Sequence, residues 1–309
     1  MTVLTMPARP GHDTAPPPVP WRRMVWVTWR QHRATMISVP AVLGALALFL
    51  LFAGLKVHHD YAVLTACHPK GSAACEALNR TFNGTDWTLG NTLNILMHLL
   101  PVLLGMFAGV PLLARELEAG TFRYAWTQGV GRERLTIAKL AMLAVVITVL
   151  AWAFSQLFTW FFEPFLPQED TNVLAATVFD TRGIAFAAWT LAAFCIGAFL
   201  GMLLRRVIPA MAVTLGVYLV LALGIWPLRK HYPVAVVTDN PGSIPFTSGP
   251  STPNSPWFLS SWTSGGKYWT SYIPVSRFWP MQFIEAGWLL AFAMALGAAT
   301  LWLVRRRAA

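Results

Sequence analysis

The fold is decided by two long apolar blocks that follow one another almost without interruption, GIAFAAWTLAAFCIGAFLGMLL (Gly183–Leu204) and VIPAMAVTLGVYLVLALGIW (Val207–Trp226). Each block is long enough to cross a bilayer core of roughly 30 Å as an α-helix, at about 1.5 Å of rise per residue. Only Arg205 and Arg206 separate the blocks, so we expect a tight helical hairpin. A helix satisfies its backbone N–H and C=O groups internally, as hydrocarbon requires, and the alternation of a transmembrane β-strand is missing. The sequence therefore predicts an α-helical membrane protein.

The rest of the 309-residue chain has the same character, with 56% hydrophobic residues, 12% charged residues and a mean hydropathy of +0.52. Soluble domains carry about 25% charged residues. We expect an all-α membrane protein with six transmembrane helices, at Thr35–Leu55, Asn91–Leu113, Ile137–Phe162, Gly183–Leu204, Val207–Trp226 and Phe283–Val304.

The N-terminal part precedes the first span and has two sections. Residues 1–20 are rich in Pro and predict a disordered tail, whereas residues 21–309 form a single transmembrane domain. Within that domain, residues 21–33 place Trp21, Val25 and Trp29 at helical spacing among arginines, which is typical of an interfacial helix in the headgroup region. The alternative is that this segment simply extends the first span.

The distribution of basic residues sets the orientation. Fifteen of the 23 Lys and Arg residues lie in the two tails and in the second and fourth connections, and cytoplasmic segments are the ones that hold such an excess. We therefore expect a multi-pass protein of the bacterial plasma membrane with both termini cytoplasmic. The outside loops are then residues 56–90, 163–182 and 227–282, and topology rather than nucleic-acid binding accounts for the net charge of +10.

The outside loops contain two features of interest. Cys67 and Cys75 lie in a short stretch on the oxidising side, so a disulfide is expected there, with a Cys/His metal site as a weaker alternative. The loop at residues 227–282 is dense in Trp, Pro and Gly, and we expect short amphipathic or re-entrant helices in it. Glu163 and Glu285, at the outer ends of their spans, are expected to reach water, or else to pair with Arg277 or Arg182.

Catalytic motifs are absent from the sequence. It has no G-x-x-x-x-G-K-[ST] phosphate loop, and the nearest imitation, Gly265-Gly266-Lys267, is followed by Tyr268. It also lacks H-E-x-x-H, G-x-S-x-G and C-x-x-C. We therefore expect no enzymatic activity and no cofactor or metal bound by this chain.

Polar and small residues recur at helical spacing in the second span. Asn91, Asn94 and His98 share one face, which either lines a substrate path or makes structural contacts near the headgroups and with a neighbouring helix. Two small-residue motifs, Gly105-x-x-x-Gly109 and Gly197-x-x-x-Gly201, predict close helix packing, either inside the bundle or between two chains.

The segment Ala114–Leu140, between the second and third spans, is short, charged and interrupted by glycines. It reads ARELEAGTFRYAWTQGVGRERLTIAKL, with a helix breaker at Gly120 and aromatic residues after it. Such a segment can present Phe122, Tyr124 and Trp126 to a partner protein. The alternative is a solvated loop whose aromatic rings rest on the membrane surface.

This segment resembles the ABC-2 type permeases, the membrane halves of bacterial ABC exporters. The likeness lies in Glu118-Ala119-Gly120-Thr121, followed by Trp126-Thr127-Gln128 and Gly129-Val130-Gly131-Arg132, and in the run from Tyr272 to Pro280 before the last span. The resemblance implies a type V exporter-like permease fold. It also implies a docking loop for the ATPase, made by Arg115, Glu116, Glu118, Gly120, Thr121, Phe122, Trp126, Gln128 and Arg132.

The resemblance further implies a complex of two permease chains, identical or paralogous, with two separate ATP-binding subunits that hold ATP and Mg. By the family pattern the second and fifth spans border the substrate path, to which the fifth span offers only Thr214 and Tyr218. The resemblance thus predicts the permease subunit of an ATP-driven exporter. The alternatives are a membrane anchor or sensor that moves no cargo, and a stand-alone secondary carrier.

Overall fold

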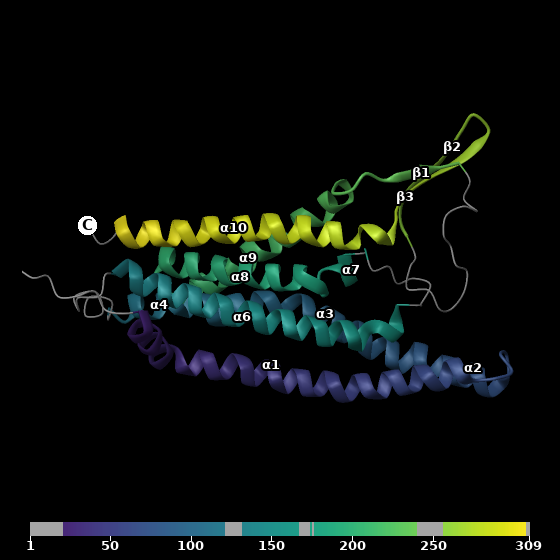
Figure 1. Cartoon of the computed structure of the whole chain (residues 1–309), viewed down its shortest axis with the longest axis horizontal. Coiled ribbons are helices and arrows are strands. Elements are labelled where there is room, and N and C mark those ends of the chain that lie inside the picture. The colour runs from purple at the N-terminus through teal and green to yellow at the C-terminus, as the bar shows by residue number, and fades with distance from the viewer. Residues whose placement is uncertain (1–20, 121–131, 167–173, 175, 240–255, 307–309) are drawn as a thin grey trace, which may run out of the picture.

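The computed structural model describes residues 21–120, 132–166, 174, 176–239 and 256–306. Six of its helical stretches are long and apolar enough to cross a membrane, which confirms the predicted all-α architecture. Figure 1 shows these helices lying along the long axis of the molecule. We call the end that holds the beginning of α1 and the end of α10 the inner end, and the opposite end, which holds the strands, the outer end.

The first two spans are longer than the hydropathy of the sequence suggests. Helix α1 covers Trp21–Ala66 without a break, although it contains Pro40, and helix α2 begins again at Ala73. The second span then continues to Glu118 through α2 (Ala73–Thr81), the π-helical turn η1 (Phe82–Asp86), α3 (Trp87–Leu104), the π-helical turn η2 (Gly105–Gly109) and α4 (Val110–Glu118). Much of the expected outside loop 56–90 is therefore helical.

The other spans end close to the predicted positions. They are α6 (Arg132–Phe162), α8 (Gly183–Leu204), α9 (Val207–Ile225) and α10 (Phe278–Arg306). Short helical turns join them on the outer side, namely η3 (Glu163–Phe165), α7 (Ala176–Phe179), η4 (Trp226–His231) and η6 (Val275–Arg277). Between α8 and α9 the chain reverses at Arg205, whose φ of 57° is left-handed, so the predicted tight hairpin is present.

Helix α8 is the centre of the bundle. It contacts α10, α6, α4, α9 and α3, and most of its side chains are buried. Its apolar residues surround the helix on all sides, which is the pattern of a helix enclosed by other helices. The outer helices α1, α9 and α10 bury much less of their surfaces, as expected for helices that face lipid on one side.

At the outer end, α1 and α2 form a hairpin closed by a disulfide between Cys67 and Cys75. The hydroxyl of Ser72 accepts a hydrogen bond from the Cys75 N–H at 3.3 Å and so caps the first turn of α2. On α1, Lys56 donates to Asp60 and to the buried carboxylate of Asp86, at 2.6 and 2.7 Å. These contacts join α1 to η1 beyond the apolar part of the first span.

The expected helices of the 227–282 loop are only partly found, because its described part is mainly a small antiparallel sheet. Strands β1 (Val236–Thr238), β2 (Trp257–Ser264) and β3 (Lys267–Ile273) pair in the order β1-β3-β2. The hairpin between β2 and β3 turns at Gly265 and Gly266, which both have positive φ, as a two-residue hairpin loop requires. The pair that imitates a phosphate loop in sequence is therefore a strand connection.

Candidate functional site

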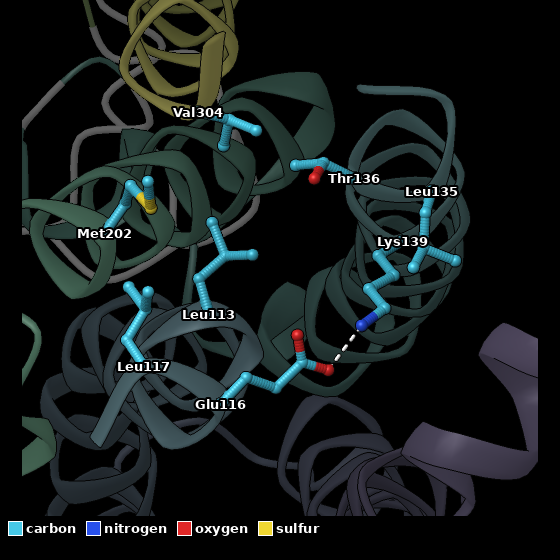
Figure 2. A pocket seen from close by; sticks show the side chains of 8 residues that line it. All are labelled: Leu113, Glu116, Leu117, Leu135, Thr136, Lys139, Met202 and Val304. Atoms are coloured by element: carbon cyan, nitrogen blue, oxygen red, sulfur yellow. Dashed lines mark hydrogen bonds and ion pairs between the residues drawn. The ribbon is translucent and has the colours of Figure 1, made fainter. Parts of the chain in front are cut away.

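The inner ends of α4 and α6 are joined by an ion pair whose cation is buried. Lys139 on α6 is 2% exposed, and it is one of the basic residues counted for the second connection. Its Nζ donates to the Glu116 carboxylate of α4, and Figure 2 shows the two side chains directed toward each other. A buried ammonium is costly unless it is paired, so this contact joins the two helices that flank residues 121–131.

A small cavity lies beside this pair and has a volume of only about 10 Å³. Its walls come from α4, α6, α8 and α10, and they comprise Leu113, Glu116, Leu117, Leu135, Thr136, Lys139, Met202 and Val304 (Figure 2). Such a volume has room for about one water molecule. The cavity is thus part of the packing between four helices and too small for cargo.

The remaining described residues of the predicted docking loop lie at the end of α4. Arg115 is exposed, and Gly120 has a φ of 67°, so helix α4 ends where the sequence predicts a helix breaker. The Glu118 carboxylate accepts a hydrogen bond from the backbone N–H of Val207, in the first turn of α9, at 3.1 Å. This link between the second and fifth spans has no signal in the sequence.

Other predicted docking residues cannot be placed in this way. Thr121, Phe122, Trp126 and Gln128 lie outside the described residues, as does the side chain of Arg132. Their assignment to a docking loop stays a prediction.

The polar row of the second span is used in part for helix contacts. Asn91 is exposed, but Asn94 is buried, and its side-chain oxygen accepts from the Thr181 hydroxyl at 3.2 Å. The ring Nδ1 of His98 lies 2.8 Å from the backbone carbonyl oxygen of Asn94. The contact of Asn94 matches the structural alternative for this face, while His98 remains partly exposed.

The polar residues of the fifth span also face inward. Thr214 is buried and donates to the Ala210 carbonyl of its own helix at 2.7 Å. Tyr218 packs edge-on against Trp189 of α8, with ring centroids 5.5 Å apart. The outward face of α9 instead carries an apolar groove of about 690 Å³, lined by Val213, Gly216, Val217, Val220, Leu221, Gly224, Ile225 and Leu228.

The two predicted small-residue motifs pack against each other inside the chain. A Cβ atom built on Gly197 would lie 2.3 Å from the Gly105 carbonyl oxygen, and one on Gly109 would lie 2.5 Å from that of Phe194. A Cβ atom built on Gly201 would likewise lie 2.6 Å from the Val110 carbonyl oxygen. Such contacts let two backbones approach closely, so these glycines form the seam between the second span and α8.

A buried charged cluster at the outer end was missed in the sequence. Arg229, in η4, is 1% exposed and donates to both oxygens of Glu285 at 2.8 and 2.9 Å and to Asp180 at 2.5 Å. Glu285 is 0% exposed and also accepts from the indole of Trp189 at 2.7 Å. The expectation that Glu285 reaches water is wrong, because its side chain is buried between α10 and Trp189 of α8 and its partner is Arg229 instead of Arg277 or Arg182.

Glu163 is exposed, in line with the expectation for this acid. Nearby, Arg182 precedes α8, donates to the Thr159 carbonyl oxygen at 3.0 Å and is largely buried. Burial lowers the pKa of Arg182 to about 10, with the Glu163 charge acting in the opposite direction. Among the described residues no group of three or more His, Cys, Asp or Glu side chains could hold a metal ion.

Comparison with known proteins adds one finding to this geometry. The family model described as "ABC-2 membrane transporter related" matches residues 40–229, which is more than half of the chain. No curated protein and no solved structure matches the chain. The matched region runs from the first span through α9 and Arg229, and so includes the seam of glycines and the segment between α4 and α6. The chain therefore belongs to the family of ABC-2 related membrane transporters.

Proposed function

We propose that this chain is the permease subunit of an ATP-driven exporter and that it is coupled to a separate ATP-binding subunit through the segment between α4 and α6. Membership of the family supports a membrane transporter permease that associates with an ATP-binding subunit. ATP and Mg²⁺ bind the partner subunit in this proposal, and the present chain supplies the substrate path.

The observation that carries the proposal is the way both ends of this segment are attached to the bundle. The Glu116 carboxylate on α4 binds Lys139 on α6, and Glu133 at the start of α6 binds Arg305 at the end of α10. A force applied to residues 119–131 would therefore act on several spans at once. A docking site for an ATPase needs this attachment to several spans, whereas a solvated loop does not require it.

We place the contact with the second permease chain, identical or paralogous, at the outward face of α9. Added Cβ atoms on Gly216 and Gly224 would meet nothing within 4 Å, whereas the glycines of the two predicted motifs are all occupied within the chain. Open glycines on an apolar membrane helix let a second helix approach closely. A substrate path between two such chains would be mostly apolar, which favours hydrophobic cargo.

The first test is co-purification of the chain with an ATP-binding subunit from its native membrane. Trp126→Ala and Phe122→Ala should reduce the recovered ATPase several-fold, because they remove the aromatic contacts predicted for docking. Trp152→Ala is the control, since Trp152 is exposed on α6 within the span. Full recovery of the ATPase with both loop variants would contradict the docking assignment.

The second test separates a permease from an anchor or sensor. The complex is reconstituted in vesicles, and ATP-dependent movement of a panel of hydrophobic dyes and lipids is measured. A transporter moves at least one of them only with ATP and Mg²⁺. A complex that hydrolyses ATP and moves none would favour the anchor or sensor, and movement driven by an ion gradient without the ATPase would favour a secondary carrier.

The third test addresses the contact between permeases. Val220 on the α9 groove is 74% exposed and Val145 on α6 is 63% exposed, so they make a matched pair of sites. In a background without Cys195, Val220→Cys should form a cross-link within the complex and Val145→Cys should not. Cross-linking at Val145 alone would indicate that the interface between the two permease chains lies on α6.

A further inference from the structure

The acids next to residues 119–131 each bind a different span. Glu116 binds Lys139 of α6, Glu133 binds Arg305 of α10, and Glu118 accepts a hydrogen bond from the Val207 N–H of α9. The first two contacts are ordinary ion pairs between side chains. The third is different, because the acid binds the backbone at the beginning of a span.

Helix α9 has no cap of its own at this end. Its N-cap residue, Arg206, makes no side-chain hydrogen bond to the helix, and Pro209 in the first turn has no N–H group. The first N–H groups of a helix lack partners within the helix and carry a partial positive charge. The Glu118 carboxylate therefore supplies in trans the acceptor and the negative charge that a local capping residue would give.

An apolar contact lies directly beside this hydrogen bond. Val110 and Ala114 of α4 pack with Ala210 of α9, and all three are fully buried. Val110, Ala114 and Glu118 are spaced by four residues, so they lie on one face of α4. Helix α4 thus runs along the first turn of α9, and Glu118, the last residue of α4, completes this contact two residues before the left-handed Gly120.

We propose that Glu118 is a positioning residue that transmits movement of the inner end of α4 to the fifth span by capping the first turn of α9. This inference rests on the proposed coupling function and assigns the route of that coupling. The Glu118 oxygen that accepts from Val207 connects two spans of the permease, and in this proposal the aromatic residues further along the segment make the contact with the ATPase.

The test uses the complex with its ATPase, with spin labels on Ala119→Cys and Ile208→Cys in a Cys195→Ala background. Ala119 is exposed at the end of α4 and Ile208 is 81% exposed in the first turn of α9. We expect one narrow distance distribution between the labels, with and without a non-hydrolysable ATP analogue and Mg²⁺. In Glu118→Ala the distribution should broaden.

A second label pair reports the transmitted movement, with Ile208→Cys on α9 and Trp302→Cys on α10, where Trp302 is 53% exposed. The distance should shift on addition of the ATP analogue in the parent protein, and this shift should be lost in Glu118→Ala. Glu118→Gln keeps an acceptor oxygen, so most of the shift in distance should be present in this variant. Glu116→Gln is the matched control, since it removes the charge of an acid on the same helix but keeps an acceptor oxygen for Lys139, and it should leave the Ala119–Ile208 distance narrow.

The outcomes separate this inference from the proposed function. If the parent protein shows no nucleotide-dependent shift in the Ile208–Trp302 distance, the transmission role is wrong. It is also wrong if Glu118→Ala shows the same shift as the parent protein. Loss of the ATPase from Glu118→Ala also overturns it, because Glu118 would then be a docking contact. If the parent protein itself recovers no ATPase, the failure lies in the proposed function.

Discussion

At the scale of single residues, Arg229 is a buried cation that binds two acids at once. It brings together Asp180 before α8 and Glu285 in α10, which are far apart in the sequence, and its guanidinium also lies 4.6 Å from the ring centroid of Phe179. Three charged groups can be buried together here because most of their polar atoms have hydrogen-bond partners. The cluster fixes the outer ends of α9 and α10 to the beginning of α8.

We expect Arg229→Met to lower the free energy of unfolding by about 3 to 5 kcal/mol, since it leaves two acids without their cation. Chemical unfolding in detergent measures this loss. Arg277→Met is the control, because Arg277 is exposed in η6, directly before α10. Adding Glu285→Met to Arg229→Met should cost less than the sum of the single changes, and additive losses would contradict a direct contact.

A second residue pair gives a pH dependence on the outer sheet. Lys267 of β3 donates to Asp239, just after β1, at 2.7 Å, and this contact lowers the pKa of Asp239 below its ordinary value of 3.8. A depressed carboxyl pKa stabilises the folded state above the ordinary value, and the effect is lost as the pH falls through the lowered one. The protection of the β1 amides against hydrogen exchange, taken relative to the intrinsic rate at each pH, should therefore fall below about pH 4. Asp239→Asn should abolish this dependence, and an unchanged profile would contradict it.

At the scale of elements, the pairing of α8 with the second span depends on glycines. The Cα atoms of Gly105, Gly109, Gly197 and Gly201 lie against the backbone of the facing helix, so no side chain fits between them. The sequence could identify these motifs but could not say whether a neighbouring span or a second chain occupies them. The answer depends on how the helices are rotated about their axes.

Gly197→Ala should lower the free energy of unfolding by about 1 to 3 kcal/mol, because its Cβ would approach the Gly105 carbonyl oxygen to 2.3 Å and the helices must separate. Thermal unfolding in detergent checks this. Gly287→Ala on α10 is the control, since an added Cβ there meets nothing within 4 Å. Equal effects at the two positions would argue against a close seam.

At the scale of the whole molecule, the two ends of the bundle differ in chemistry. Among the described residues, the inner end holds most of the basic ones together with the beginning of α1 and the end of α10, and the outer end holds the disulfide hairpin and the β-sheet (Figure 1). The distribution of basic residues predicts that the inner end faces the cytoplasm. The fold itself is compatible with either direction in a membrane.

Cysteine labelling on intact cells tests this orientation, with Leu78→Cys on α2 and Ala119→Cys at the end of α4 as single changes in a Cys195→Ala background. Both positions are exposed, and Cys67 and Cys75 are bonded to each other. A membrane-impermeant maleimide should label Leu78→Cys directly and Ala119→Cys only after lysis. The reverse pattern would invert the assigned topology.

The sequence alone determined the number of spans, their order and the tight α8–α9 turn, because hydropathy and helix length are local properties of the chain. The sequence did not predict that α1 extends to Ala66, where the disulfide hairpin supports the helix outside its apolar segment. It also did not predict the sheet, for which the glycine pair at Gly265 and Gly266 was the signal. Only the tertiary structure decided that Arg229 meets Glu285 and that Glu118 caps α9. Those contacts depend on which faces of distant helices are turned toward each other, and helix rotation is set by packing across the whole bundle.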